Sequence, residues 1–120
     1  MSKKVLFVDD ESELISVFEE IIGQFDRRLI FALSARDAIE VLKVHDVGLV
    51  ICDYWMPKGK GTEILDYLLQ SGKPIDFCFF TGRPVEDFTD LRGINCIYRK
   101  PEDMKLVLNR IHAFLRSDIA

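Results

Sequence analysis

The chain has 120 residues, of which 48% are hydrophobic and 30% charged, and its formal net charge is −4 at pH 7. This length suits one hydrophobic core, so residues 1–120 are expected to form a single domain. The negative charge disfavours non-specific binding to nucleic acid. There is no apolar stretch near the roughly 20 residues of a membrane span and no signal peptide. These features predict a cytoplasmic protein that binds neither membrane nor nucleic acid directly.

Strand-like and helix-like patterns alternate from one end of the chain to the other. The expected strands are short, nearly continuous apolar runs, at residues 5–8, 29–33, 48–52, 75–80 and 94–98. The expected helices carry apolar side chains at helical spacing, at residues 12–25, after a Ser34 N-cap, at 61–70 and at 102–116. Residues 83–92 hold only a weak helical pattern. Five such βα units predict a parallel sheet with helices on both faces, whose strand order the pattern leaves open.

The three cysteines, Cys52, Cys78 and Cys96, each lie within an apolar strand-like run. They share no CxxC spacing, and their odd number does not favour a redox pair or a metal site. A free cysteine packs as a small apolar side chain. We therefore interpret all three as buried core residues.

Polar side chains stand where four of the expected strands end. Asp53 closes the third strand and opens a loop rich in glycine and proline, and the other strand ends carry Asp9, Asp10, Thr81 and Lys100. Because ligands of open α/β sheets bind beyond the carboxyl ends of the strands, these groups are expected to share one crevice. Three carboxylates repel one another there, which favours a hard cation such as Mg²⁺. A lysine and a hydroxyl suit the oxygens of a phosphoryl group.

The order and spacing of these motifs resemble the receiver domain of two-component response regulators, from Val5 to about Leu115. The matching segments are Val8-Asp9-Asp10-Glu11, Asp53-Tyr54-Trp55-Met56-Pro57 with Gly61, Thr81-Gly82 and Lys100-Pro101. The resemblance implies a flavodoxin-like, doubly wound (βα)5 α/β fold, a three-layer sandwich with parallel strand order 2-1-3-4-5. It is similar in particular to single-domain, chemotaxis-type regulators, which carry no output domain.

The resemblance also implies a role for each site residue. Asp53 would accept a phosphoryl group from a histidine kinase or phosphotransfer protein, and Lys100 and Thr81 would bind its oxygens. The Mg²⁺ cofactor would be held by Asp53, by Asp10 directly, by Asp9 largely through water, and by the main-chain carbonyl of Trp55. The Lys100–Pro101 bond is expected to be cis, which proline makes accessible.

Further positions bear on signalling. Tyr98 matches the aromatic residue of the receiver family that moves inward with the threonine, here Thr81, when the aspartate is phosphorylated. The resemblance implies that Trp55 and Arg83 flank the phosphoryl group, and they are expected to lengthen its lifetime by hindering water. The interval from Thr81 to Lys100 is shorter than is usual in the family, so the helix within it is expected to be abbreviated or irregular.

Two other functions have to be weighed against the phosphoacceptor signalling module. A Mg²⁺-dependent aspartyl-phosphate phosphohydrolase would need a second acid two residues after the nucleophile, where this chain has Trp55. A pseudo-receiver that never takes phosphate would not need all five site residues. The run Lys58-Gly59-Lys60-Gly61-Thr62 lacks the order of a phosphate-binding loop and is interpreted as solvated. We therefore expect no enzyme activity beyond self-phosphorylation and dephosphorylation. Output is expected through protein contacts or through onward relay of the phosphoryl group, either from a stand-alone regulator or from a domain of a longer protein.

Overall fold

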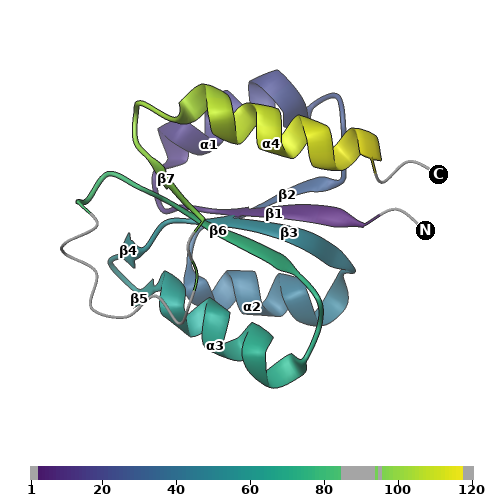
Figure 1. Ribbon diagram of the computed structural model, residues 1–120, viewed down its shortest axis with the longest axis vertical. Coiled ribbons are helices and arrows are strands. Elements are labelled where there is room, and N and C mark those ends of the chain that lie inside the picture. Colours follow the sequence, from purple (N-terminus) through teal and green to yellow (C-terminus); the bar gives the residue numbers. More distant parts are fainter. Residues whose placement is uncertain (1–2, 85–93, 95, 118–120) are drawn as a thin grey trace.

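A five-stranded parallel sheet forms the middle of the molecule (Figure 1). The computed structural model describes residues 3–84, 94 and 96–117. In spatial order the strands are β2 (Leu29–Ala32), β1 (Lys4–Val8), β3 (Val47–Cys52), β6 (Asp76–Thr81) and β7 (Ile97–Arg99). Since β6 and β7 are the fourth and fifth sheet strands along the chain, the expected order 2-1-3-4-5 is confirmed.

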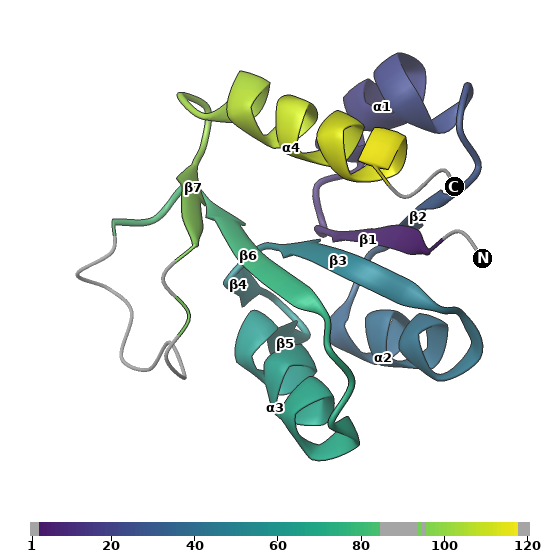
Figure 2. The same ribbon diagram turned by 45° about the vertical axis from the view of Figure 1, so that its right-hand side comes forward.

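Helices cover both faces of this sheet and complete the three layers. In chain order they are α1 (Ser12–Phe18), which continues into the π-helix η1 (Glu19–Gly23), α2 (Ala35–Val44), α3 (Gly61–Ser71) and α4 (Met104–Ser117). Helices α1 and α4 lie on one face, and α2 and α3 lie on the other (Figures 1 and 2). Among the described residues, no helix is both long enough and apolar enough to cross a membrane.

Alternate residues of each strand face opposite layers. In β1, Leu6 and Val8 pack in the core beneath α2 and α3, whereas Val5 and Phe7 pack in the core beneath α1 and α4. Both sets are almost fully buried. A strand whose side chains are buried on both faces reads as a continuous apolar run, which is why the strand patterns carry no polar alternation.

The first helix departs from the expected span of 12–25. Its end widens into a π turn in which Gln24 N–H donates to the Glu19 carbonyl, 2.8 Å away and five residues back. The wider turn rotates the following side chains, so Ile22 remains buried but Ile21 and Phe25 are 44% and 78% exposed. The apolar side chains expected at helical spacing over residues 12–25 therefore do not form one buried stripe.

The loop after β3 is more ordered than expected. Strands β4 (Trp55–Met56) and β5 (Gly59–Lys60) pair antiparallel within it, and Gly59 has a φ of 128°, a conformation that favours glycine. Gly61 is buried at the start of α3, so only part of the run 58–62 is solvated. The helix expected within 83–92 falls mostly on residues 85–92, which lie outside the described residues.

Candidate functional site

A crevice of about 490 Å³ opens beyond the carboxyl ends of the strands. Its walls come from the ends of β1, β3, β6 and β7 and from the β4–β5 hairpin. The lining residues are Asp10, Glu11, Asp53, Trp55, Met56, Pro57, Thr81, Gly82, Arg83 and Lys100. The polar residues expected to meet at this edge therefore do so, except that Asp9 is buried and takes part through Lys100.

Three carboxylates form the acidic part of the crevice. One oxygen from each of Asp9, Asp10 and Asp53 can be chosen so that all three lie within 4.8 Å of one another. Asp9 and Asp53 are buried, whereas Asp10 is exposed. Oxygen ligands this close, one of them open to solvent, fit a small divalent cation that keeps several waters.

The Lys100 ammonium bridges these acids. Its Nζ lies 2.6 Å from Asp9 Oδ2 and 3.3 Å from Asp53 Oδ2. A third acid, Glu11, accepts from the same Nζ at 2.9 Å. The bond from Lys100 to Pro101 is cis, as expected. The lysine therefore offsets charge on both buried carboxylates.

Burial changes how these groups titrate. It raises the pKa of Asp53 from 3.8 to about 6, with the neighbouring Asp9 charge adding to the rise and Lys100 opposing it. Burial also raises the pKa of Asp9, against its hydrogen bond to Lys100. Burial lowers the pKa of Lys100, but its hydrogen bond to Asp9 and the charges of Asp53 and Asp9 outweigh that effect, and the net shift is upward. The pKa shifts therefore favour the cationic form of Lys100 and make the Asp53 carboxyl harder to ionise than an ordinary aspartate.

Trp55 and Arg83 lie together beside Asp53. The Trp55 main-chain N–H donates to Asp53 Oδ1 at 3.4 Å. The Arg83 guanidinium carbon lies 5.0 Å from the centroid of the Trp55 ring, and Lys60 Nζ lies 4.5 Å from it. Arg83 N–H also donates to Thr81 Oγ1 at 3.2 Å. An indole flanked by cations thus forms one wall of the crevice.

Gly61 allows the chain after Asp53 to fold back tightly. Its N–H donates to the Tyr54 carbonyl at 3.0 Å. A Cβ at this position would lie 2.6 Å from the Asp53 carbonyl oxygen and 3.1 Å from Cys52 Sγ. Only glycine fits here without moving the backbone that carries the aspartate.

Replacing Gly61 with alanine should therefore displace the main chain of Asp53. We expect a loss of about 1–3 kcal/mol in the free energy of unfolding, the usual cost of overpacking, measured by urea denaturation. Gly82→Ala is the matched control, because its Cβ would lie 3.9 Å from the nearest atom, Lys100 Cβ. Equal stability of the two variants would contradict this account of the turn.

The family comparison agrees with this geometry. The sequence profile described as "Response regulator receiver domain" matches residues 5–112. The chain belongs to the response regulator receiver family. A receiver domain is a phosphoacceptor signalling module rather than an enzyme that turns over a separate substrate, and the phosphohydrolase alternative is set aside on that ground.

The curated relatives that this chain matches are longer proteins. It is 26% identical to the alkaline phosphatase synthesis transcriptional regulatory protein PhoP of Bacillus subtilis, over 100% of this chain and 52% of PhoP. It is 29% identical to the transcriptional regulatory protein CpxR of Escherichia coli K12, over 94% of this chain and 49% of CpxR. The chain spans about half the length of these two relatives.

Solved structures share the fold. A signal receiver domain from Vibrio parahaemolyticus superposes with a TM-score of 0.80 at 21% identity, covering 98% of this chain and 93% of that one. The non-phosphorylated HemR receiver domain from Leptospira biflexa gives a TM-score of 0.74 at 23% identity, covering 94% of each chain. At these identities the likeness concerns the fold.

Some features of the receiver domain were not expected from the sequence. Glu11 joins the site by accepting a hydrogen bond from Lys100, and its sequence signal was only that it is a third acid after Asp9-Asp10. Lys60 joins it by lying over the Trp55 ring, and its sequence signal was only a lysine in the loop. Tyr98 lies outside the crevice, half-buried on β7.

The interpretation of the cysteines as unpaired core residues is confirmed for Cys52 and is wrong for the other two. Cys78 and Cys96 form a disulfide, whereas Cys52 is free and buried. The two bonded cysteines stand one residue before the register pair Phe79 and Ile97 of β6 and β7. Their proximity depends on this register, which spacing along the sequence does not reveal.

Proposed function

We propose that this receiver domain, taken over residues 1–120, accepts a phosphoryl group on Asp53 in a two-component phosphorelay. The observation that carries the proposal is the placement of the Asp53 carboxylate in a crevice with the Lys100 ammonium 3.3 Å away and two further acids within reach. Phosphoryl transfer depends on positioning and charge neutralisation, and this arrangement provides both.

In the proposed reaction an Asp53 carboxylate oxygen attacks the phosphorus of a phosphohistidine on a histidine kinase or phosphotransfer protein. The new P–O bond forms as the P–N bond breaks, and the departing imidazole nitrogen takes a proton. Lys100 is 13% exposed at its side chain, so it reaches the crevice and can pair with a phosphoryl oxygen. The Thr81 hydroxyl donates to another oxygen.

Mg²⁺ is the proposed cofactor, and the donor set suits it. Asp10 is the exposed carboxylate and would be a direct ligand, together with Asp53 and the Trp55 main-chain carbonyl. Asp9 already accepts from Lys100 and from the Glu11 N–H at 2.9 Å, so it would act largely through water. When bound, Mg²⁺ offsets charge on the transferring phosphoryl group.

The proposed switch runs from Thr81 to Tyr98. The Thr81 hydroxyl lines the crevice and accepts a hydrogen bond from the Arg83 N–H, and its own proton can still be donated to a phosphoryl oxygen. Tyr98 is paired in register with Phe80, next to Thr81. We propose that Tyr98 moves inward after Thr81 and changes the face formed with α4, which a downstream protein then recognises. The domain would work in the cytoplasm without binding nucleic acid or membrane.

Incubation with acetyl phosphate and Mg²⁺ tests this function. We expect the mass of the intact protein to increase by one phosphoryl group, with no increase in Asp53→Asn or when Mg²⁺ is chelated. A pseudo-receiver would give no increase in any sample. Rapid continuous release of phosphate would instead indicate hydrolytic turnover and contradict the proposal.

Trp55 and Arg83 are proposed to prolong the phosphorylated state by covering the attack path of water. Trp55→Ala should shorten the half-life of the phosphorylated domain by about tenfold, the effect of a barrier change near 1.4 kcal/mol. Trp55→Phe, which keeps an aromatic wall, is the control. The decay is followed by intact mass after the phosphodonor is removed, and an unchanged half-life in Trp55→Ala would refute the shielding role.

A further inference from the structure

The disulfide lies on the sheet face that α4 covers. Cys78 and Cys96 come from the neighbouring strands β6 and β7, and their Cα atoms are 4.8 Å apart. The Phe79 N–H donates to the Cys96 carbonyl at 3.0 Å beside the bond. The cross-link therefore ties the edge strand β7, which carries Tyr98, to the strand that carries Thr81.

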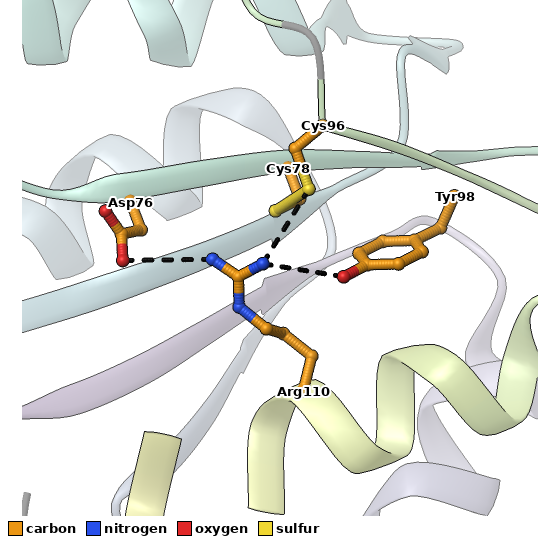
Figure 3. The surroundings of a disulfide bond; sticks show 5 residues. All are labelled: Asp76, Cys78, Cys96, Tyr98 and Arg110. Carbon is orange, nitrogen blue, oxygen red and sulfur yellow. Dashed lines mark hydrogen bonds and ion pairs between the residues drawn. A yellow bond between two sulfur atoms is a disulfide. The ribbon is translucent and has the colours of Figure 1, made fainter. Parts of the chain in front are cut away.

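The two sulfurs have different surroundings. Cys78 is 1% exposed, whereas Cys96 is half-buried. Arg110 of α4 reaches Cys96, and its Nη1 lies 3.9 Å from Cys96 Sγ (Figure 3). A cation beside a sulfur attracts an approaching thiolate and, once the bond is open, stabilises the thiolate that is left there. Of the two sulfurs, Cys96 Sγ is therefore the one that a thiolate can reach and that has a cation beside it.

Arg110 also connects the disulfide to the proposed switch residue. Its Nη1 lies 3.5 Å from Tyr98 Oη, and its Nη2 lies 3.8 Å from Asp76 Oδ2. Figure 3 shows the guanidinium between Asp76, Cys96 and Tyr98. One nitrogen is therefore shared by the reactive sulfur and the tyrosine hydroxyl.

We propose that Cys78 and Cys96 are a reversible thiol–disulfide pair, a second modification site whose state is passed to Tyr98 through Arg110. The effect on signalling rests on the switch proposed above, but the exchange chemistry does not. In reducing compartments, disulfides of folded proteins are typically transient or sensory, which fits a domain proposed to work in the cytoplasm.

The exchange partner is a thiol of low molecular weight or a protein dithiol. Its thiolate attacks Cys96 Sγ, the bond to Cys78 breaks, and the Cys78 sulfur leaves with the electron pair and takes a proton. A second thiolate then attacks the partner's sulfur in the mixed disulfide, and the Cys96 sulfur departs with its electron pair. The domain gains two electrons and one proton, which leaves Cys78 as a thiol and Cys96 as a thiolate beside Arg110. The partner becomes a disulfide, and the reverse sequence closes the bond.

Opening the bond would change the contacts of Tyr98 in two ways. A Cys96 thiolate competes with Tyr98 Oη for Arg110 Nη1, whereas the sulfur in the disulfide carries no charge. Strand β7, whose described span is only Ile97–Arg99, would then be held to β6 without a covalent link. Both changes alter how freely Tyr98 can move.

The first measurement is a redox titration in mixtures of reduced and oxidised glutathione, with thiols counted by alkylation and mass spectrometry after denaturation. The Cys52→Ser variant removes the remaining thiol, which burial keeps protonated by raising its pKa well above the ordinary value. We expect a reversible two-electron transition that survives in Asp53→Asn. A bond that stays closed, or stays open, at every ratio would overturn the proposal.

The second measurement identifies which of the two cysteines forms the mixed disulfide with the exchange partner. Oxidised glutathione should form a mixed disulfide in Cys78→Ser about tenfold faster than in Cys96→Ser, since only Cys96 is both reachable and beside a cation. Arg110→Gln in the Cys78→Ser background should slow this reaction several-fold, and Arg116→Gln on the same helix is the control. Equal rates at the two cysteines would contradict the assignment.

The third measurement concerns Tyr98. The chain has three tyrosines, and ring-labelled tyrosine gives each an NMR signal, with Tyr98→Phe providing the assignment. Reduction should move the Tyr98 signal and leave that of Tyr67, on α3 at the opposite face, in place. A Tyr98 signal that is identical in both redox states would refute the link to the switch, whatever the result of phosphorylation at Asp53.

Discussion

Replacing Lys100 with methionine should lower the free energy of unfolding by about 3 kcal/mol at neutral pH without Mg²⁺. The side chains of Asp9 and Asp53 are 1% and 9% exposed and both lie against the Lys100 ammonium. Removing the cation leaves two buried carboxylates without their counter-charge, and breaking a buried ion pair on one side typically costs about 3–5 kcal/mol. The loss is measured by urea denaturation.

The dependence of this stability loss on pH and Mg²⁺ distinguishes an effect of the missing charge from an effect of lost packing. The deficit of Lys100→Met should shrink on acidification, because the two carboxylates take up protons, and on addition of Mg²⁺, which replaces the missing charge. Lys43→Met is the control, since Lys43 is 53% exposed and pairs only with exposed Glu40 among the described residues. A deficit that is independent of pH and Mg²⁺ would show that packing, not charge, dominates.

Replacing Asp53 with asparagine should stabilise the metal-free domain. The pKa of Asp53 is raised from 3.8 to about 6, chiefly by burial. The native state thus binds the Asp53 proton more tightly than the unfolded chain, so this contribution to stability is complete below about pH 4 and is lost as pH rises through about 6. At about 1.4 kcal/mol per pKa unit, the asparagine variant should be more stable by about 2–3 kcal/mol near pH 7.5.

The advantage of Asp53→Asn should disappear as the pH falls towards 4, where Asp53 of the wild type is also neutral. Asp26→Asn provides a control of opposite sign. The pKa of Asp26 is lowered, mainly by its hydrogen bond to the Arg28 side chain, so its replacement should destabilise at neutral pH and less so in acid. Urea denaturation curves between about pH 4 and pH 7.5 measure both effects. A stability difference between Asp53→Asn and wild type that does not change with pH would contradict the role of burial.

The core of the site could be predicted because it depends on where strands end. Continuous apolar runs locate strands buried on both faces, and Asp9, Asp53 and Thr81 sit at the carboxyl ends of such runs. In a parallel sheet those ends share one edge, so the crevice follows from the pattern without any knowledge of strand order. The order itself came from the resemblance to receiver domains.

Features that depend on side-chain direction and register could not be predicted. The π turn after Phe18 leaves the apolar pattern intact while turning Phe25 into solvent. The Cys78–Cys96 bond requires β7 to pair with β6 in one register. The position of Lys60 over Trp55 requires the β4–β5 hairpin to turn at Gly59. Each of these is decided by tertiary contacts rather than by local sequence.

The chemical identity of the phosphoacceptor is tested most directly by trapping the acyl phosphate. After incubation with acetyl phosphate and Mg²⁺, borohydride reduces an aspartyl phosphate to homoserine, and peptide mass spectrometry locates the changed residue. We expect homoserine at position 53 and at no other aspartate, with none formed in the absence of Mg²⁺. Homoserine at Asp9 or Asp10 instead, or unmodified Asp53 in a protein that carries phosphate, would contradict the central claim.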